Sequence, residues 1–528
     1  MKNTALIKEQ QQQIAQLTEQ VSQLTQQLDW FKRQLFGRKS EKHVLDNPYQ
    51  NALFIKAALA DTSRGDSTRP TTEVKAHKRT SKKQHHQDDV NDTGLRFSDD
   101  TPQRIIDVPA PELEGDDADD YEIIDYKETV RLAQQHASYV VLRYRRPVVR
   151  HKASQTLNTA AAPDNVLEGS YADVSVLAGL MVDKAVYHLP LYRQHQRMLD
   201  AGIKVSRTTL INWMHKGIEL LEPVYQAQWR HVLQSQMLAM DEVPIKAGRK
   251  NKGKMQQTCF WPIYGEEDEV VFTWSRSRGT QHAIDQLNGF NGTLLTDGYP
   301  VYDRAVAQLN KAEADIVHAN CWAHARRYFE KSLAVEPDLA QQALAQIGEL
   351  YAVEKQTRQQ CERTGKTLTA ETILSARQQY SEPIVTGFFQ WVEELRQNPA
   401  LLPSNPMSQA LVYVCERIRS LKVFLGNPHV PLDTNHLERA LRVIPMGRKN
   451  YLFCWSELGA EQLGMLQSLM VTCRLQGINP YTYLVDVLQR IGRHPASRVD
   501  ELTPRVWKDK FGENFLTSDL GKMGSSQY

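Results

Sequence analysis

Three acidic residues stand where regular structure is expected to end or begin. The apolar run MLAM is followed by Asp241, and the run GTLLT is followed by Asp297. Short apolar runs of this kind indicate buried strands, so both carboxylates should leave the edge of a sheet. The third acid, Glu438, lies in DTNHLER, where the first turns of a helix are expected. A lone acid after a strand is more often a loop cap, so the chemical interpretation depends on all three.

The chemistry open to three such carboxylates is the binding of two divalent cations. Hard cations prefer oxygen ligands, which favours two Mg²⁺ ions, with Mn²⁺ as an alternative. Two ions about 4 Å apart clamp the attacking and leaving oxygens of a phosphoryl transfer. In this interpretation Asp241 bridges both ions, and Asp297 and Glu438 each complete one site. Water then nicks a DNA strand, and the freed 3′-hydroxyl attacks another strand without a covalent enzyme intermediate.

The elements around the first two acids predict an α/β fold. Three strands are followed by an alternation of helices and strands, expected at about 235–245, 256–264, 269–275, 280–288, the strand before Asp297, 301–309 and 315–319. Three antiparallel strands followed by such an alternation are the order of a ribonuclease-H-like fold. Residues 229–320 are therefore predicted to form the first part of a catalytic core.

The segment between the second and third acids is predicted to be helical. Residues 321–426 contain long helical patterns, which makes them an expected insertion into the catalytic core. The core should resume over 427–490, with Glu438, and a C-terminal tail should follow at 491–528.

The N-terminal region carries a heptad pattern. Ile7, Ile14 and Val21 occupy one core position of the heptad and Leu17 the other. The pattern predicts a coiled coil over 1–42, and hence a homodimer or higher oligomer. The alternative is a single amphipathic helix packed on its own chain. Residues 43–120 lack this periodicity, and a disordered linker is predicted there.

A small β module is predicted over 121–165, because two segments alternate between apolar and polar residues. Its second strand carries four arginines, Arg143, Arg145, Arg146 and Arg150. This basic strand could face phosphates, or it could be an ordinary exposed edge protected by charge.

Residues 166–228 read as helices with a helix-turn-helix layout. Gly202 ends one helix, and Ser206 caps the next. The start of the second helix is where such a motif reads a DNA groove, although two-helix turns also occur in proteins that do not bind DNA. The candidate groove-facing side chains are Arg207, Thr208, Thr209 and Asn212.

Further basic residues accompany the acids. They could line a phosphate channel, or they could be surface charges and ion pairs; they are Arg326, Arg327, Arg439, Arg442, Arg448 and Lys449. Cys321 and His324 form a CxxH, but two soft ligands without a second pair are weak evidence for zinc. We expect a buried structural pair at a helix start, and no zinc.

Composition sets outer bounds. The chain has 528 residues, a formal charge of +2 and six scattered cysteines, which fits reduced thiols in a cytosol. No apolar run approaches the length of a membrane span, and the N-terminus lacks the apolar region of a signal peptide. The sequence therefore predicts a cytoplasmic protein without a membrane partner.

Several motifs together carry a specific resemblance. They are LPLYRQHQRMLDAGIKVSRTTLINWM, AMDE, LLTDGYPVY, NCWAHARRYF, DTNHLERALR and MGRKNYLF. In this order the sequence resembles the large transposase subunit of the insertion-sequence-66 family over residues 171–490. The segment LFGRKSEK extends the resemblance to the N-terminal region.

The resemblance implies a bacterial DDE transposase that cuts and joins DNA at the terminal inverted repeats of its element, with Mg²⁺ as cofactor. The triad carries over to Asp241, Asp297 and Glu438, and accessory proteins of the same element are implied as partners. Val243 stands where the family usually has threonine. The family's cysteine-rich zinc module has no counterpart, because no cysteine precedes Cys259.

Two other functions fit parts of the pattern. A catalytically silent DNA-binding regulator of transposition would keep the fold without the chemistry, but the intact triad argues against it. A glycosidase could also use paired carboxylates, yet it leaves the basic motifs unexplained.

Overall fold

The computed structural model describes residues 96–97, 101–114, 117–135, 138–251 and 253–525. The predicted coiled coil at 1–42 lies outside these residues, as does most of the predicted linker. Among the described residues, no helix combines the length and apolar character needed to cross a membrane.

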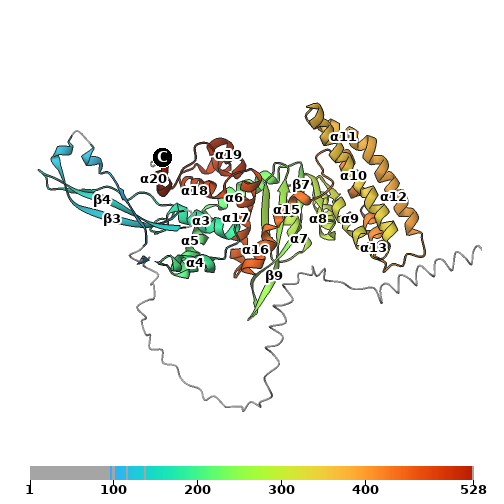
Figure 1. Cartoon of the computed structure of the whole chain (residues 1–528), viewed down its shortest axis with the longest axis horizontal. Helices are drawn as coiled ribbons and strands as arrows, with labels where there is room; N and C mark the ends of the chain where they lie inside the picture. The colour runs from blue at the N-terminus through green and yellow to red at the C-terminus, as the bar shows by residue number, and fades with distance from the viewer. Residues whose placement is uncertain (1–95, 98–100, 115–116, 136–137, 252, 526–528) are drawn as a thin grey trace, which may run out of the picture. The chain divides into compact units, whose positions relative to one another are not determined.

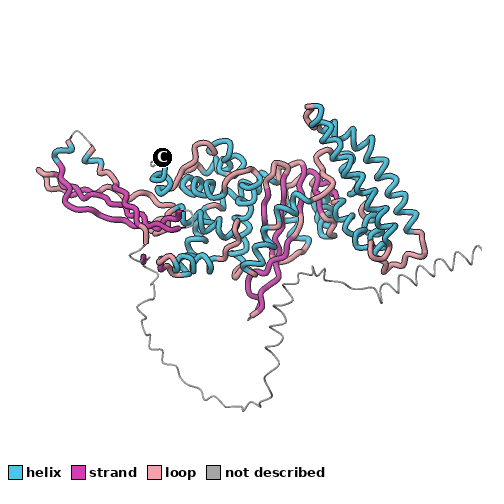
Figure 2. Tube along the Cα trace, viewed as in Figure 1, coloured by secondary structure: helices cyan, strands magenta, loops and turns pink. Residues whose placement is uncertain are grey.

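The centre of the fold is a six-stranded mixed sheet (Figures 1 and 2). Its strands are β7 (Met237–Met240), β8 (Val243–Asn251), β9 (Lys254–Gly265), β10 (Val270–Ser275), β11 (Gly292–Thr296) and β12 (Ile316–Asn320). The order is β10-β9-β7-β11-β12, with β8 also paired to β9. The first three strands of the path are antiparallel, whereas β7, β11 and β12 run parallel. The predicted strands and helices of this region are present, except that the single strand expected over 235–245 is two strands, β7 and β8, separated by Asp241 and Glu242.

Helices cover both faces of the sheet. On β7, Leu238 and Met240 face a core shared with α7 (Thr280–Leu287) and α8 (Pro300–Lys311). Ala239 faces the opposite core, shared with α15 (Asn435–Leu441), α16 (Val443–Tyr451) and α17 (Glu457–Leu475). A strand with apolar residues on both faces needs such covering, which explains why MLAM lacks alternation.

One glycine determines how closely the first residues of β7 and β11 can approach each other. Gly292 has a φ of +145°, and a Cβ there would come within 2.4 Å of the carbonyl oxygen of Gln236. A side chain would therefore push apart the two parallel strands that carry Asp241 and Asp297.

The segment between β12 and α15 is helical, as predicted. It contains α9 (Trp322–Ser332), α10 (Pro337–Thr364), α11 (Ala370–Ala376), a π-helix η3 (Arg377–Ser381), α12 (Glu382–Arg396), α13 (Pro406–Glu416) and α14 (Ile418–Gly426). Trp322 anchors it: its ring packs on Phe388 and Phe424, and its indole N–H donates to the carbonyl oxygen of Leu421 at 2.9 Å.

The predicted helix-turn-helix region is helical as well. It consists of α3 (Val174–Ala185), α4 (Leu191–Asp200), the two-residue strand β6 (Ile203–Lys204), α5 (Arg207–Leu220) and α6 (Glu222–Val232). Strand β6 pairs with β1 (Arg96–Phe97). Ser206 caps α5 by accepting a hydrogen bond from the Thr209 backbone at 3.0 Å, as expected.

The predicted C-terminal tail is wrong as a description of residues 491–525. They form η4 (Ala496–Leu502), α19 (Pro504–Phe511) and α20 (Asp519–Ser525), which follow α18 (Pro480–Arg490). Leu502 and Trp507 are buried in one core with α3 and α5. The Trp507 indole N–H donates to Asp486 at 2.9 Å. Short elements gain stability only from such tertiary packing, which local periodicity does not reveal.

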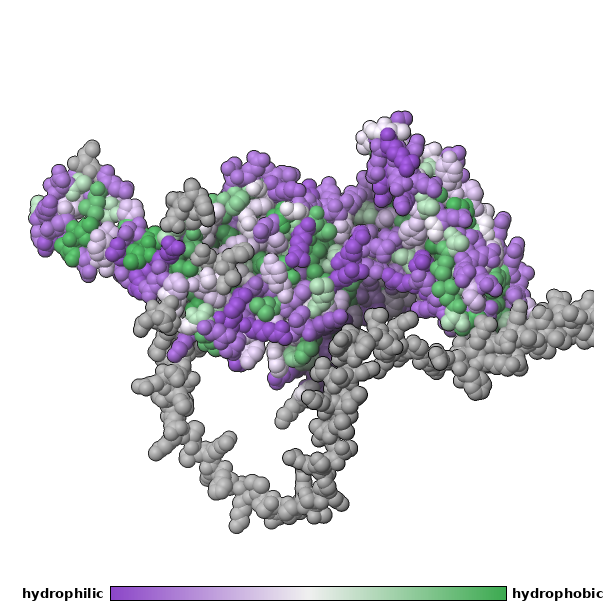
Figure 3. Space-filling view, in the orientation of Figure 1, coloured by the Kyte–Doolittle hydropathy of each residue, from purple (hydrophilic) through white to green (hydrophobic). Residues whose placement is uncertain are grey.

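The β module is longer than predicted. It has β2 (Gln103–Asp107), β3 (Tyr121–Gln135), β4 (Ser138–His151) and β5 (Leu157–Thr159), with short helices η1 (Pro111–Leu113) and η2 (Ala118–Asp120) between β2 and β3. Strand β2 lies within the range predicted as linker and pairs parallel with β4, so that prediction is wrong over its last residues. Exposed apolar side chains lie along the hairpin (Figure 3), including Ile105 and Ile123.

The arginines of β4 are engaged within the module. Arg143 binds Glu128 and Gln103, Arg145 binds Asp107, and Arg150 binds Glu122. These partners lie on the flanking strands and fix the position of β2. The arrangement favours a charge-paired sheet over a free phosphate-binding edge.

Candidate active site

Two of the predicted acids meet at one edge of the sheet. Because β7 and β11 are parallel neighbours, Asp241 and Asp297 leave the sheet at the same end. Asp241 accepts a hydrogen bond from the Glu242 backbone at 2.7 Å, and Asp297 accepts one from the Tyr299 backbone at 2.8 Å. Carboxylate oxygens of Asp241, Glu242 and Asp297 all lie within 4.8 Å of one another. We call these three residues the carboxylate cluster.

The carboxylate cluster concentrates negative charge. Burial, followed by the charges of Glu242 and Asp297, raises the pKa of Asp241 to about 7, and Glu438 contributes in the same direction. Within the part of the chain that the structure describes, neither Asp241 nor Asp297 forms an ion pair with a basic side chain. A divalent cation bound by these oxygens would relieve the repulsion, and an all-oxygen donor set suits Mg²⁺ or Mn²⁺.

Glu242 is the member of the cluster for which the sequence suggested no role. It is buried, and it receives hydrogen bonds from the Arg278 guanidinium and from the Tyr302 hydroxyl, the latter at 2.7 Å. Arg278 also lies over the ring of Tyr299, 4.8 Å from its centroid. The only signal in the sequence was the adjacency of Glu242 to Asp241, since Arg278 and Tyr302 lie in a distant loop and helix.

Glu438 lies beside the cluster and is held by a cation. A terminal nitrogen of Arg327 on α9 donates to both of its carboxylate oxygens, at 2.5 and 2.7 Å. His324, one turn earlier on the same helix, approaches Glu438 at 3.8 Å. Burial, and then the charge of Arg327, lowers the pKa of His324. The structure therefore brings Asp241 and Asp297 together, with Glu438 near enough to act on the pKa of Asp241.

The two residues of the CxxH motif have different roles. Cys321 is buried and accepts hydrogen bonds from the backbone and hydroxyl of Thr434, at 3.4 and 3.5 Å. This contact joins the start of α9 to the start of α15, which carries Glu438. The structural role expected for Cys321 agrees with this contact, whereas His324 belongs to the surroundings of Glu438.

The helical segment helps to position Asp297. From α13, the Tyr413 hydroxyl donates to the carbonyl oxygen of Asp297, and Arg417 donates to that of Gly298 at 2.9 Å. Gly298 has a φ of +87°, and a Cβ there would lie 2.5 Å from Arg417 Nε. The turn after β11 therefore depends both on glycine and on side chains more than a hundred residues away.

The predicted DNA-contacting residues fall into two groups. Arg207, Thr208 and Asn212 are exposed at the start of α5, while the Thr209 hydroxyl bonds the cap residue Ser206. Of the basic residues predicted near the acids, Arg439, Arg442 and Lys449 are exposed and form no ion pair with a described residue. The others have partners within the chain: Arg326 pairs with Glu330, Arg327 with Glu438, and Arg448 donates to the carbonyl oxygen of Pro244.

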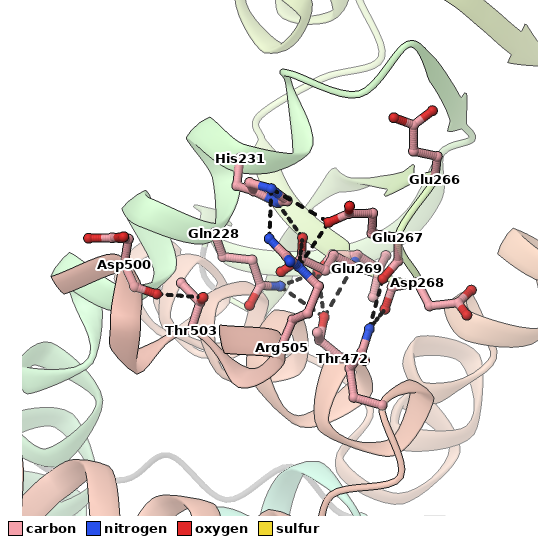
Figure 4. Close-up of polar contacts among 12 residues, drawn as sticks. Gln228, His231, Glu266, Glu267, Asp268, Glu269, Thr472, Asp500, Thr503 and Arg505 are labelled. Carbon is pink, nitrogen blue, oxygen red and sulfur yellow. Dashed lines mark hydrogen bonds and ion pairs between the residues drawn. The ribbon is translucent and has the colours of Figure 1, made fainter. Parts of the chain in front are cut away.

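A second group of acids lies elsewhere in the fold, between α6, the start of β10 and α19 (Figure 4). It consists of His231, Glu267 and Glu269, which we call the histidine cluster. Arg505 contacts all three members, with nitrogen atoms 2.8 Å from His231 Nε2, 3.0 Å from Glu267 and 3.4 Å from Glu269. The hydrogen bond to Glu269 raises the pKa of His231. Here the chain supplies its own cation, so the residues do not fit a metal site.

Comparison with known proteins identifies the class of the chain. Residues 169–462 match the transposase IS66 family, and residues 468–505 match the IS66 C-terminal element. Residues 23–93 match a region described as transposase C of IS166 homeodomain. The first match covers more than half of the chain, so the protein belongs to the IS66 transposase family. A homeodomain-like region and a transposase family both indicate DNA as a partner.

The chain is also similar to proteins of Sinorhizobium fredii (strain NBRC 101917 / NGR234). The uncharacterized protein y4hP is 29% identical over 373 residues, which cover 67% of this chain and 66% of that protein. The uncharacterized protein y4qI is 28% identical, over 77% of this chain and 76% of its own length. The chain thus spans about two thirds of the length of the first relative.

Proposed function

We propose that the protein is a DDE transposase, which binds the terminal inverted repeats of a bacterial insertion sequence and catalyses DNA cleavage and strand transfer. The observation that carries the proposal is the carboxylate cluster, where Asp241 and Asp297, at the ends of two parallel strands, converge without an ion pair to a basic side chain among the described residues. Family membership supports the reaction class. The strand order β10-β9-β7-β11-β12 supports a ribonuclease-H-like catalytic core, interrupted by the helical segment.

In this proposal Asp241, Asp297 and Glu438 hold the divalent ions. Bound Mg²⁺, or Mn²⁺ in its place, would supply Lewis-acid charge at the scissile phosphate. Arg278 neutralises Glu242 and keeps that carboxylate fixed behind Asp241. Tyr413 and Arg417 hold the backbone that carries Asp297.

Glu438 must exchange its partner for this role. In the structure its oxygens are bonded by Arg327, which restrains Glu438 beside the cluster. We infer that Arg327 releases Glu438 when metal and DNA bind and then lies free to contact a phosphate. The exposed Arg439, Arg442 and Lys449 extend the same basic surface along α15 and α16.

The DNA ends are the proposed ligand of α5, through Arg207, Thr208 and Asn212. A homodimer through residues 1–42 would bring two ends together, and accessory proteins of the same element remain proposed partners. The place of action is the bacterial cytoplasm, on the nucleoid when the protein is DNA-bound.

The Arg327–Glu438 pair also favours a second candidate. If this pair is permanent, the chain is a catalytically silent DNA-binding regulator of transposition. The two candidates share DNA binding and differ only in chemistry.

The deciding experiment measures strand nicking on a plasmid that carries the ends of the element, with and without Mg²⁺. We expect Asp241→Asn and Asp297→Asn to reduce nicking by at least about a thousandfold, because each removes a metal ligand, while DNA binding persists. Glu349→Gln, an exposed acid on α10 without an ion pair among the described residues, serves as the matched control and should retain activity. Wild-type nicking that is absent, or that survives both substitutions, contradicts the transposase proposal.

A further inference from the structure

An exposed tryptophan stands next to the strand that leaves the carboxylate cluster. Trp455, in the loop after α16, has 65% of its surface exposed, and its neighbour Leu452 has 63%. Leu452 also has a φ of +65°, a backbone conformation that non-glycine residues rarely adopt. The exposed ring of Trp455, with a second exposed apolar side chain close by in the chain, is a candidate contact surface for a ligand.

The loop is fastened to the central sheet. The Cys454 backbone N–H donates to the carbonyl oxygen of Lys246 at 2.9 Å, and Gly248 returns a bond to Cys454 at 3.2 Å. A parallel bridge between Ala247 and Cys454 results. Arg448, from α16, binds the carbonyl oxygen of Pro244 on the same strand. Trp455 follows directly after the residue that is bonded to β8, and β8 begins immediately after Glu242.

Positive charge surrounds the indole ring. The Arg249 guanidinium lies 5.1 Å from the centre of the Trp455 ring. Lys246, Lys250 and Lys254 are exposed on the same β8–β9 hairpin. In the described part of the chain none of these four side chains pairs with an acid. The neighbouring acid, Glu457, is itself neutralised by Arg276 at 2.7 Å.

We propose that Trp455 and the basic β8–β9 hairpin form a stacking platform for an unpaired base of the DNA strand that leads to the carboxylate cluster. Aromatic rings beside lysine and arginine are the combination that binds single-stranded nucleic acid, because bases stack on the ring while cations follow the phosphates. A purely electrostatic duplex contact needs no exposed indole. The inference rests on the proposed function, since it assigns the substrate strand of that same site.

The geometry of β8 supports a fixed platform. Gly248 has a φ of +70° at a break in the β8–β9 register, and a Cβ there would lie 3.1 Å from the side chain of Glu457. The bulge directs Arg249 toward the ring of Trp455 instead of continuing the regular alternation.

The test compares two DNA probes with the wild-type full chain in EDTA, where no cleavage takes place. One probe is a fork with 2-aminopurine in its unpaired arm, and the other is the fully paired duplex of the same sequence. We expect Trp455→Ala to weaken fork binding by roughly 5- to 100-fold and to change duplex binding by less than about threefold. Trp455→Phe should recover most of the fork affinity and the quenching of 2-aminopurine.

The matched control is Tyr380→Ala, an aromatic residue of η3 with 54% exposure that lies outside the proposed DNA-contacting regions. It should leave both affinities unchanged. Equal loss on fork and duplex, or no loss on either, overturns the stacking platform. Binding is measured without metal, so it does not depend on catalysis. If the wild-type protein binds the fork selectively but does not nick DNA, the result supports the platform and contradicts the proposed catalysis.

Discussion

The carboxylate cluster and the histidine cluster use similar side chains with opposite charge balance. In the histidine cluster, Arg505 contacts both glutamates and the imidazole, so the buried charge of Glu269 is compensated within the chain. In the carboxylate cluster, Arg278 pairs with Glu242, but Asp241 receives no ion pair from any described residue, and its pKa rises to about 7. Glu438, outside the cluster, pairs with Arg327.

The difference in charge balance distinguishes acids with a structural role from acids with a functional role. A buried carboxylate paired with arginine fastens α19 to α6 and to the sheet. A group of carboxylates left short of positive charge destabilises the folded chain until a cation is bound, which is the arrangement expected at a site of chemistry. Acids that lie close together therefore do not by themselves identify a metal site. The absence of a neutralising basic side chain is what identifies it.

The largest effect on stability is expected from breaking the histidine cluster. Arg505→Gln leaves Glu269 buried without its guanidinium partner, so the free energy of unfolding should fall by about 3 kcal/mol. Urea denaturation in EDTA measures it. Arg396→Gln removes an exposed pair with Glu393 and should leave stability almost unchanged, because solvent screens that pair. If Arg505→Gln and Arg396→Gln have equal stabilities, the charge compensation within the histidine cluster does not stabilise the fold, and the contrast between the two clusters is wrong.

Asp241→Asn should change the stability in the opposite direction. The folded chain holds the Asp241 proton up to a pH of about 7, whereas the unfolded chain releases it near 3.8. The free energy of unfolding of the metal-free wild type therefore falls as pH rises through this window, and the variant does not undergo this loss. At pH 8 we expect the variant to be the more stable of the two, with little difference near pH 4.

The measurement is the midpoint of urea unfolding from pH 4 to pH 8 in EDTA. Glu349→Gln serves again as control, since it removes a negative charge outside the cluster. A constant difference between Asp241→Asn and wild type at all pH values would show that repulsion within the cluster is not the cause.

The smallest effect is the stabilisation by metal itself. Mg²⁺ at ten times its dissociation constant should raise the free energy of unfolding of the wild type by about 1.4 kcal/mol, and EDTA should reverse it. Arg505→Gln should keep this increment, because its cluster does not bind the ion, while Asp297→Asn should lose most of it. Differential scanning calorimetry checks both. If Mg²⁺ raises the free energy of unfolding of Asp297→Asn by the same amount, the ion binds elsewhere in the protein.

Sequence patterns were enough to predict most of the central fold. The apolar runs before Asp241 and Asp297 are strands because burial on both faces leaves a continuous apolar signature. The same reasoning failed for β2 and for the segment after residue 491, where short elements are stabilised by distant partners. Leu502 and Trp507, for example, are buried against a distant part of the chain: the Tyr483 hydroxyl donates to the carbonyl oxygen of Leu502 at 2.7 Å, and the Tyr483 ring packs on Trp507.

The candidate site also has one part that the sequence predicted and another part that it could not predict. Asp241 and Asp297 could be assigned because parallel strands end at one edge, a rule that needs no coordinates. The partners of the acids could not be assigned: Arg278 lies 36 residues from Glu242, and Arg327 lies 111 residues from Glu438. Trp455 gave no signal either, since exposure is a property of the fold.

By itself, the sequence determined which segments form strands and helices, which acids end them, and the family to which the motifs point. Only the tertiary structure decided which charges are neutralised, which acid is left with a raised pKa, and which aromatic ring faces solvent. The physical reason is range: periodicity and capping act within a few residues, whereas ion pairing and burial depend on side chains that only the folded chain brings together.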